Sequence, residues 1–401
     1  MGPETILVAH DEASVQGRCR AVLGAAGYRV VLVSHPEELA AAIRTGSPSA
    51  ILVSARFCGS SPWTALRYGG PVIQLSDGAG AAGPVGTAAG RVLAWPVPDD
   101  ALAAAVRDAL SLAIAVRFWG VRGSIARASR DTVEYGGNTP CVEVEVSGAE
   151  HLFVWDAGTG IRELGRALSG RKPIQGFICF SHFHWDHIQG LPFFEPAYAP
   201  ENQFALVGPA QLTADILQIL SMQMTPVYFP LTMDQLRANL SLQEISEGPL
   251  TLGGVHFDTL TTLHAGTTLV YRLSHGGKRI IYAPDTELPL GWKSQGGEAA
   301  HKVERFVEFC READLLIHDG QYTPEELERR RGWGHSAWTD VQDLAIAASV
   351  KRLVLFHHDP DHSDAFLDAI GEALVAREID HAHPAAPQHP FDLVAICENG
   401  S

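Results

Sequence analysis

The sequence of 401 residues contains few cysteines, and they are widely separated. The six are Cys19, Cys58, Cys141, Cys179, Cys310 and Cys397. No CxxC pair occurs, and several of the cysteines lie inside apolar runs. A disulfide framework belongs to small secreted domains with closely spaced cysteines. We therefore expect reduced thiols and exclude a disulfide-stabilised fold.

Long apolar runs are also missing. No apolar stretch reaches the roughly 18 residues that a transmembrane helix requires. The N-terminus lacks the charged region and the long apolar region of a secretory signal. We therefore expect a cytoplasmic protein that makes no contact with a membrane.

Basic residues are in the minority, with 30 Lys and Arg against 46 Asp and Glu, which gives a net charge of −16. Nearly all of the excess negative charge lies in residues 116–401. Proteins that wrap a long nucleic acid neutralise its phosphates with Lys and Arg. The composition therefore argues against a long nucleic acid as partner and favours a small substrate.

The sequence does contain enough apolar material for more than one core. Hydrophobic residues make up 46% of the chain and aromatic residues 8%, which is typical of globular proteins. A chain of 401 residues is too long for one ordinary domain. We predict two domains, residues 1–113 and residues 114–401, with no flexible linker between them.

Residues 1–113 alternate short apolar strands with helical segments. Strands are expected at residues 5–9, 29–33, 50–53, 71–75 and 91–94, and the last helix at residues 99–112. This alternation predicts an α/β fold with a doubly wound parallel sheet. The segment resembles a response-regulator receiver domain.

The resemblance to receivers does not include their phosphorylation site. Receivers have two acids after the first strand, an aspartate after the third and a lysine after the fifth. This sequence has His10 before Asp11, then Ser54, then Trp95 at those positions. Because serine cannot form the acyl phosphate, the resemblance implies a pseudo-receiver that serves dimerisation or docking. We expect a homodimer.

The strongest chemical signal is the heptapeptide Ser-His-Phe-His-Trp-Asp-His at residues 181–187. It follows the apolar run at residues 177–180, which predicts a buried strand. Open α/β sheets bind ligands at the carboxyl ends of their strands. Imidazole and carboxylate groups together suit zinc, manganese or iron. The heptapeptide therefore predicts a metal site on the loop that leaves this strand.

This motif resembles the signature of the metallo-β-lactamase superfamily, and the resemblance extends from about residue 116 to the C-terminus. It implies an αββα sandwich that holds one or two metal ions between two sheets. Two divalent ions are expected. They are zinc or, alternatively, manganese or iron. The resemblance implies that the first is bound by His182, His184 and His264, the second by Asp186, His187 and His357, and that Asp285 bridges them.

The last ligand position has two candidates. His357 and His358 both follow the apolar strand expected at residues 352–356. We favour His357, because it is the first residue beyond that strand.

Three residues are expected to support the metals or the reaction. Asp156 stands where relatives of the superfamily have an aspartate that supports the metal histidines, although it could instead cap the helix expected at residues 161–168. His335, in Gly-His-Ser, resembles a histidine that faces the scissile phosphate in phosphodiester-cleaving relatives. Asp319 either orients His335 or is a turn residue. We assign His335 and Asp186 to catalysis.

These residues together predict a two-metal-dependent phosphodiesterase. A hydroxide that bridges two metals would attack phosphorus, and His335 would assist the leaving oxygen. We expect a small or cyclic nucleotide as substrate, because the chain is acidic and lacks the Gly- and Lys-rich arm with which tRNA-maturing relatives grip RNA. Two alternatives remain: a ribonuclease Z-like tRNA-processing endoribonuclease, and a non-catalytic signalling adaptor that uses metal structurally.

Overall fold

The computed structural model describes residues 4–35, 38–39, 41–43, 48–54, 57, 72–77, 89–111, 114–147, 149–171, 173–275, 277–294, 298–381 and 392–393. The chain forms two compact units. Unit 1 comprises Met1–Ala115 with Val146–Gly148, and unit 2 comprises Val116–Glu145 with Ala149–Ser401.

Unit 1 is built on a five-stranded parallel sheet. Its strands are β1 (Thr5–Ala9), β2 (Arg29–Val33), β3 (Ala50–Ser54), β4 (Val72–Asp77) and β5 (Ala89–Trp95), and its long helices are α1 (Ala13–Ala25) and α3 (Asp99–Ser111). The strand order β2-β1-β3-β4-β5 is the flavodoxin-like order of doubly wound folds. The predicted parallel sheet is confirmed, and the receiver assignment stays a prediction.

Burial on both faces explains why the strands of this sheet are continuous apolar runs rather than alternating ones. On β1, Ile6 and Val8 belong to one buried cluster, which includes side chains of α1 and α3. Leu7 and Ala9 belong to a second cluster, on the opposite face of the sheet.

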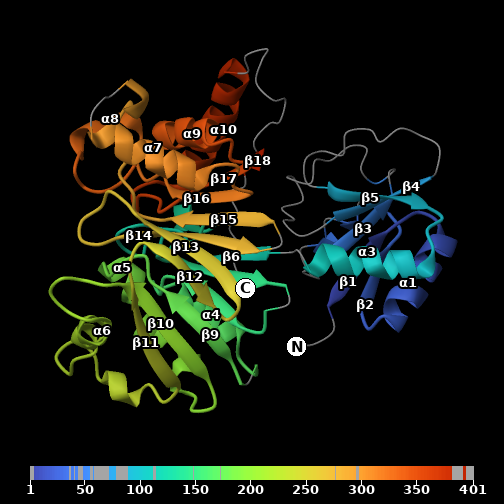
Figure 1. The fold of residues 1–401 in the computed structure, drawn as a ribbon, viewed down its shortest axis with the longest axis horizontal. Helices are drawn as coiled ribbons and strands as arrows, with labels where there is room; N and C mark the ends of the chain where they lie inside the picture. Colours follow the sequence, from blue (N-terminus) through green and yellow to red (C-terminus); the bar gives the residue numbers. More distant parts are fainter. Residues whose placement is uncertain are drawn as a thin grey trace. The chain divides into compact units, whose positions relative to one another are not determined.

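Unit 2 contains two sheets (Figure 1). The six-stranded sheet has the order β11-β10-β9-β8-β7-β6 and the seven-stranded sheet runs from β12 to β18 in sequence order. The first consists of β6 (Ile114–Gly120), β7 (Cys141–Val146), β8 (Leu152–Trp155), β9 (Gln175–Cys179), β10 (Gln203–Pro209) and β11 (Asn239–Ile245). The second consists of β12 (Gly248–Leu252), β13 (Val255–Thr261), β14 (Leu269–His275), β15 (Lys278–Ala283), β16 (Leu315–Asp319), β17 (Arg352–Phe356) and β18 (Asp392–Leu393).

Aromatic side chains fill the space between the two sheets. The Trp155 ring on β8 stacks on the Tyr282 ring on β15, with centroids 5.1 Å apart and an interplanar angle of 2°. The rings of Phe153 on β8 and Phe257 on β13 lie 5.6 Å apart. These rings are fully buried and contribute hydrophobic stabilisation that ties one sheet to the other.

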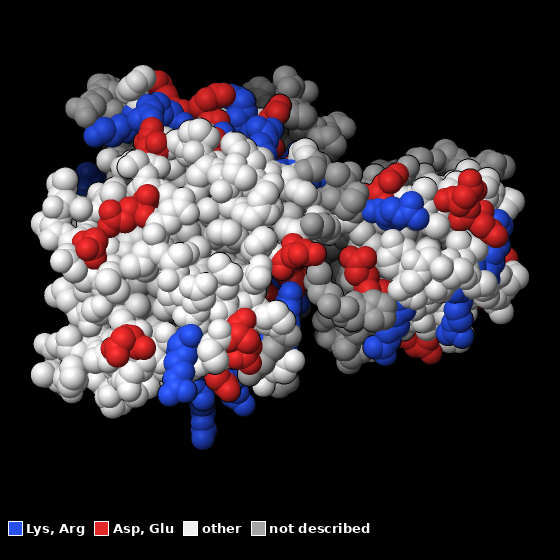
Figure 2. Space-filling view, turned by 60° about the horizontal axis from the view of Figure 1, so that its bottom comes forward, with Lys and Arg blue, Asp and Glu red and all other residues white. Residues whose placement is uncertain are grey.

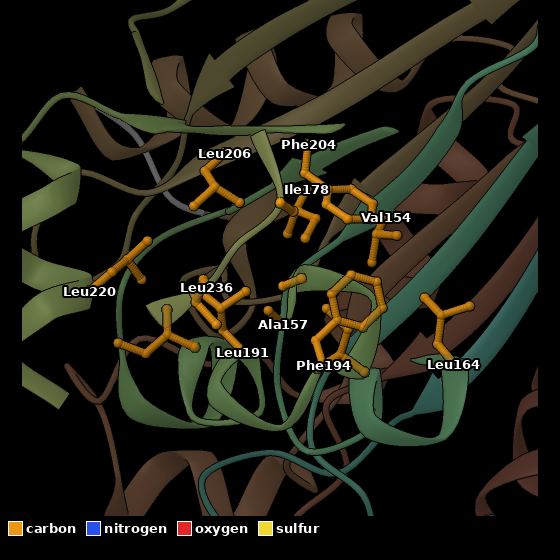
Figure 3. Close-up of a cluster of buried hydrophobic side chains, with 14 of the residues drawn as sticks. Val154, Ala157, Leu164, Ile178, Leu191, Phe194, Phe204, Leu206, Leu220 and Leu236 are labelled. Atoms are coloured by element: carbon orange, nitrogen blue, oxygen red, sulfur yellow. The ribbon is translucent and has the colours of Figure 1, made fainter. Parts of the chain in front are cut away.

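Helices cover the outer faces of both sheets. Buried residues of α4 (Ile161–Ala167) and α6 (Ile216–Gln223) pack with the six-stranded sheet in the cluster shown in Figure 3. Buried residues of α7 (Glu298–Cys310) and α9 (Trp338–Ala347) pack with the seven-stranded sheet. This arrangement confirms the predicted αββα sandwich.

Of the remaining helices, two are short, whereas the longer α10 (Asp364–His381) packs against α9 and β17 of the seven-stranded sheet. The short ones are α5 (Trp185–Ile188) and α8 (Pro324–Arg329), and 3₁₀ turns lie at η3 (Arg130–Thr132), η4 (Leu191–Phe193), η5 (Glu195–Tyr198), η6 (Met233–Gln235) and η7 (Trp292–Ser294). Of the helices in the described ranges, none combines the length and the apolar character that crossing a membrane requires.

Removing a large side chain from the core of unit 2 should be costly. Phe204 on β10 is fully buried, and its ring lies 5.3 Å from that of Phe194 (Figure 3). We expect Phe204→Ala to lower the free energy of unfolding by about 3–5 kcal/mol, because it leaves a cavity. Urea denaturation followed by tryptophan fluorescence measures the change. Leu242→Ala, at an exposed position of β11, is the control; an equal loss in both variants would contradict the packing described.

Candidate metal centre

Strand direction brings the predicted site residues to one edge of each sheet. β8 and β9 are parallel, as are β15, β16 and β17. β13 shares the direction of β15, because both are antiparallel to β14. Strands of the same direction have their carboxyl ends at the same edge. The residues at or just beyond these ends are Asp156, the heptapeptide 181–187, His264, Asp285, Asp319 and His357.

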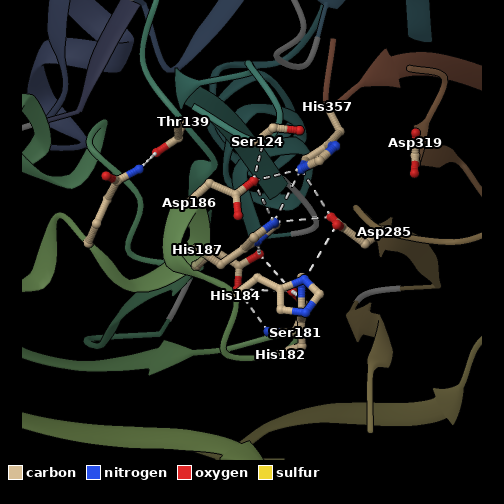
Figure 4. A network of polar contacts seen from close by, with 12 residues as sticks. Ser124, Thr139, Ser181, His182, His184, Asp186, His187, Asp285, Asp319 and His357 are labelled. Atoms are coloured by element: carbon tan, nitrogen blue, oxygen red, sulfur yellow. Dashed lines mark hydrogen bonds and ion pairs between the residues drawn. The ribbon is translucent and has the colours of Figure 1, made fainter. Parts of the chain in front are cut away.

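The heptapeptide divides into a loop and a single helical turn. His182 lies in the loop after β9, and His184 is the N-cap of α5, with its carbonyl accepting from the His187 backbone N–H at 3.0 Å. Asp186 and His187 therefore lie in the first turn of α5, next to the loop histidines. Figure 4 shows these side chains pointing toward one another and toward Asp285.

A first cluster contains His182, His184, His264 and Asp285. His264 Nε2 lies 3.1 Å from His184 Nδ1. Asp285 Oδ2 lies 3.5 Å from His264 Nε2 and 3.6 Å from His182 Nε2. Ligand atoms about 2.0–2.1 Å from a tetrahedral zinc ion are roughly 3.3 Å apart. The spacing of this cluster fits such an ion.

A second cluster contains Asp186, His187 and His357. His357 Nε2 lies 3.1 Å from Asp186 Oδ2 and 3.2 Å from His187 Nε2. The other oxygen of Asp285, Oδ1, lies 3.1 Å from His187 Nε2 and 3.3 Å from His357 Nε2. The two oxygens of Asp285 thus face different clusters, which is the arrangement of a bridging carboxylate.

Two polar atoms of the centre are buried without a hydrogen-bond partner, namely His182 Nε2 and Asp285 Oδ1. Buried polar atoms in proteins are nearly always hydrogen-bonded or serve another purpose, such as binding an ion. Both atoms face into the clusters. The donor set of imidazoles and carboxylates suits zinc, manganese or iron, so these residues could hold two divalent ions.

The pKa shifts of two histidines and of Asp285 also suit metal binding. Burial, reinforced by neighbouring histidines, lowers the pKa of His182 and His184, which favours the neutral imidazole that binds metals. Burial by itself would raise the pKa of Asp285, but His357 and His187 hold it well below its usual range. The bridging carboxylate is therefore ionised.

Asp156 holds the second cluster in place. Its Oδ2 accepts hydrogen bonds from His187 Nδ1 at 2.8 Å and from the Tyr282 hydroxyl at 2.7 Å, and its Oδ1 accepts from the Ser181 N–H at 2.8 Å. Its backbone has a φ of 58°, a conformation that is uncommon for residues other than glycine. The N-cap of α4 is Gly160. The structure therefore places Asp156 against a predicted metal histidine rather than at the start of that helix.

The two candidates for the last ligand position point in different directions. His357 has a φ of 58°, and its Nδ1 donates to Gln321 Oε1 at 2.9 Å while Nε2 faces the cluster. The His358 ring instead lies edge-on to the Tyr135 ring, 6.2 Å away. Burial, with the charge of Arg122, lowers the pKa of His358 to about 3. The structure brings His357 to the centre and not His358.

His335 and Asp319 form a pair beside the metal clusters. His335 Nδ1 donates to Asp319 Oδ2 at 2.8 Å and lies 3.9 Å from Asp285 Oδ2. The His335 ring stacks on the His357 ring, with centroids 5.0 Å apart. Burial opposes a charge on His335, but Asp319 raises its pKa to about 9. Asp319 therefore favours the charged form of this imidazole.

Several contacts of the centre were not predicted from the sequence. Gln321 orients His357, Tyr282 donates to Asp156, and the backbone N–H of Ser124 donates to Asp186 Oδ2 at 2.7 Å. Gln321 lies two residues beyond Asp319, at the carboxyl end of a strand. That position could have identified it from the sequence as a candidate site residue. A backbone N–H such as that of Ser124 leaves no trace in the sequence.

Comparisons with known proteins identify relatives of unit 2. The sequence model of a family described as "Beta-lactamase superfamily domain" matches residues 151–358. Ribonuclease Z of Methanosarcina acetivorans is 26% identical over 289 residues, which cover 62% of this chain and 88% of that protein. Ribonuclease Z of Archaeoglobus fulgidus is 23% identical over 280 residues, 60% of this chain and 86% of that protein. A metallo-β-lactamase fold protein of Bacillus subtilis has a TM-score of 0.48 and 18% identity, covering 65% of this chain and 92% of that chain.

These relatives correct the prediction about partners. The sequence analysis argued against a long nucleic acid, and that prediction is wrong, because curated relatives are ribonucleases. The net charge of the whole chain does not describe the surface near the site. Three consecutive arginines, Arg329 to Arg331, lie just before His335. On the face shown in Figure 2, acidic and basic side chains are interspersed over a mainly uncharged surface.

The ligand clusters make a testable prediction about metal content. We expect the wild-type protein to bind two divalent ions per chain after loading with Zn²⁺ or Mn²⁺. The His182→Ala variant should lose the ion of the first cluster, because the substitution removes one of its buried ligands. Elemental analysis of the purified proteins measures the stoichiometry. His256→Ala is the control, because His256 is exposed and forms an ion pair with Asp258 at 3.3 Å, away from the clusters. Equal metal content in His182→Ala and the wild type would contradict the assignment.

A glycine next to His264 provides a second prediction. Gly334 has a φ of 92°, its carbonyl accepts from His264 Nδ1 at 2.9 Å, and a Cβ there would overlap the His264 ring. We expect Gly334→Ala to weaken metal binding about 10- to 100-fold by displacing this histidine. Competition with a chelating dye measures the affinity. Gly170→Ala, also at positive φ but with open space around it, controls for backbone strain; the same affinity in both variants would refute the effect.

Proposed function

Because the chain belongs to the β-lactamase superfamily domain family, we propose that it is a metal-dependent phosphodiesterase that cleaves RNA in the manner of a ribonuclease Z. The predicted hydrolase of metallo-β-lactamase fold is confirmed by that membership, which leaves no support for a non-catalytic adaptor. The choice of RNA is supported by the curated relatives, each matched over most of its own length. The main support for phosphodiester cleavage is the His335–Asp319 pair, which lies beside the Asp285 carboxylate between the two clusters.

The proposed metal ligands are the residues of the two clusters. His182, His184 and His264 would hold one ion, Asp186, His187 and His357 the other, and Asp285 both. When bound, two such ions would supply a water of lowered pKa and neutralise charge on the phosphate. Zinc suits the donor set, as do manganese and iron.

His335 is the proposed proton donor. Its Nδ1 is occupied by Asp319, so Nε2 is the nitrogen available to a substrate. Donation from Nε2 to the oxygen that leaves phosphorus avoids the expulsion of an alkoxide. Asp319 fixes the tautomer and the ring orientation, which makes it a positioning residue.

Asp186 has a second role in this proposal. Its Oδ2 accepts from the Ser124 N–H and lies 3.1 Å from His357 Nε2, so the carboxylate cannot rotate freely. Burial by itself would raise the pKa of Asp186, but His187 and His357 together hold it well below its usual range. An ionised, fixed carboxylate can orient the attacking water by accepting its hydrogen bond.

Unit 1 is proposed to be a receiver-like domain without a phosphoacceptor. Its strand order is the one that response-regulator receivers share with flavodoxin. Ser54 is buried at the carboxyl end of β3, and His10 directly follows β1. A serine at the acceptor position supports a role other than phosphorylation.

The proposal predicts the activity of the enzyme and of a His335 variant. We expect the protein, with Mn²⁺ or Zn²⁺, to cleave a precursor tRNA, and His335→Ala to lower kcat about 10²- to 10⁴-fold because the proton donor is lost. The kcat of Asp319→Asn should lie between those of the wild type and of His335→Ala. The kcat of His256→Ala should equal that of the wild type. Gel assays of cleavage and elemental analysis of metal content test these variants together.

Other substrates in the same assay make the proposal falsifiable. A panel of 3′,5′-cyclic nucleotides represents the small substrates that the sequence analysis favoured. Cleavage of a cyclic nucleotide alone would overturn the RNA proposal. Full activity of His335→Ala with metal retained would overturn the role of His335.

A further inference from the structure

The side chain of Glu287 accepts two hydrogen bonds from the loop that precedes His335. One oxygen, Oε1, accepts from the Gly332 N–H at 2.8 Å, and the other, Oε2, accepts from the Gly334 N–H at 2.8 Å. Glu287 lies two residues beyond Asp285, whose two oxygens face different clusters. Its carboxylate therefore ties the segment after the bridging residue to the segment before the proposed proton donor.

This loop depends on hydrogen bonds for its conformation. Burial cannot fix residues 331–333, because all three are exposed. Gly332 and Gly334 have φ values of 83° and 92°, and glycine permits such conformations at the cost of being free to adopt many others. A hydrogen bond from an N–H group to a carboxylate is roughly twice as strong as one between neutral groups. Two such bonds to one carboxylate therefore favour a single conformation of this backbone.

The conformation of the loop matters for two residues of the centre. The Gly334 carbonyl accepts from His264 Nδ1 at 2.9 Å, while Nε2 of that ring faces the first cluster. The next residue is His335, whose Nδ1 donates to Asp319. A shift of this backbone would therefore move the hydrogen-bond acceptor of one histidine and the chain position of the other at the same time.

Neighbouring contacts fasten the same segments to one another. The Leu288 N–H donates to Ser336 Oγ at 2.9 Å, and the Ser336 hydroxyl donates to the Thr286 carbonyl. The backbone N–H of Glu287 donates at 2.8 Å to the carbonyl of Leu263, in the loop after β13. Glu287 thus contacts both histidine-bearing loops, one through its backbone and the other through its side chain.

We propose that Glu287 is a positioning residue for the first metal cluster and for His335. Among the described residues, Glu287 belongs to none of the ligand clusters, so it acts through Gly334 on His264 and through the same loop on His335. The second cluster is held by other contacts, so the proposal predicts an unequal effect on the two ions. The effect on metal affinity is independent of the substrate, whereas the effect on His335 rests on the proposed function.

Competition with a chelating dye tests the effect on metal affinity in the full chain loaded with Zn²⁺. We expect Glu287→Ala to weaken the binding of one ion about 10- to 100-fold and to leave the other unchanged, because only the first cluster loses its support. Glu287→Gln keeps the length of the side chain but has one acceptor oxygen instead of two. Its affinity should therefore lie between those of the wild type and of Glu287→Ala.

A double variant identifies the ion that is affected. His182→Ala is expected to retain only the ion of the second cluster. Adding Glu287→Ala to it should leave the affinity for that remaining ion unchanged, because both substitutions then act on the same cluster and their effects do not add. Further weakening in the double variant would overturn the assignment of Glu287 to the first cluster.

Asp314→Ala is the matched control. The Asp314 carboxylate also accepts from a backbone N–H, that of Arg279 at 2.9 Å, and like Glu287 it is half-buried. Asp314 precedes β16 and therefore lies at the edge of the sheet opposite the centre. Its loss should lower the free energy of unfolding without changing metal affinity. Equal weakening of metal binding in both variants would indicate general destabilisation and overturn the proposal.

Cleavage of precursor tRNA at saturating metal tests the effect on His335. We expect Glu287→Ala to lower kcat about 10- to 100-fold even with both ions bound, because the proton donor is displaced. A wild-type kcat under these conditions would overturn the effect on His335.

The proposal and the proposed function can fail independently. If the wild type cleaves no RNA but Glu287→Ala binds one ion more weakly, the proposed function is overturned and the positioning role at the first cluster is sustained. If the wild type cleaves precursor tRNA and Glu287→Ala has unchanged metal affinity and kcat, the function is sustained and the positioning role is overturned.

Discussion

The centre depends on one buried carboxylate, that of Asp285. Its two oxygens face different clusters at 3.1–3.6 Å, and the side chain is almost fully buried. A buried charge of this kind is costly unless opposite charge is placed beside it. The surrounding imidazoles supply part of that compensation, and two divalent ions would supply the rest. Much of unit 2 can be understood as the scaffold that holds ligands around this residue.

That scaffold works through the ring nitrogens that face away from the clusters. Each of four histidines has its outer nitrogen held by a hydrogen bond to a group on a neighbouring strand end or loop. The pairs are His187 with Asp156, His264 with the Gly334 carbonyl, His335 with Asp319, and His357 with Gln321. Such contacts fix both the tautomer and the ring plane, so the inner nitrogens are positioned before any ion binds. The site is therefore preorganised by hydrogen bonds as well as by strand direction.

The charge of the chain shows how a global property can mislead about a local one. A net charge of −16 is a sum over both units, and a substrate meets only the groups near the site. Carboxylates such as Asp285 and Asp186 would have their charge neutralised by bound metal and would not repel phosphate. The arginines before His335 have the opposite sign. The net charge of a protein therefore indicates its solubility and its long-range attraction for charged ligands better than it indicates the substrate.

The sequence by itself determined the sandwich fold, the parallel sheet of unit 1 and the set of chemical groups at the centre. Apolar strands that end in histidine or aspartate can be recognised locally, and strands of one direction must share an edge. Only the tertiary structure showed that the His357 ring lies at the clusters while the His358 ring packs against Tyr135, because adjacent residues after a strand point in different directions. It also revealed Gln321, Tyr282 and the Ser124 N–H, whose contacts come from other strands and loops.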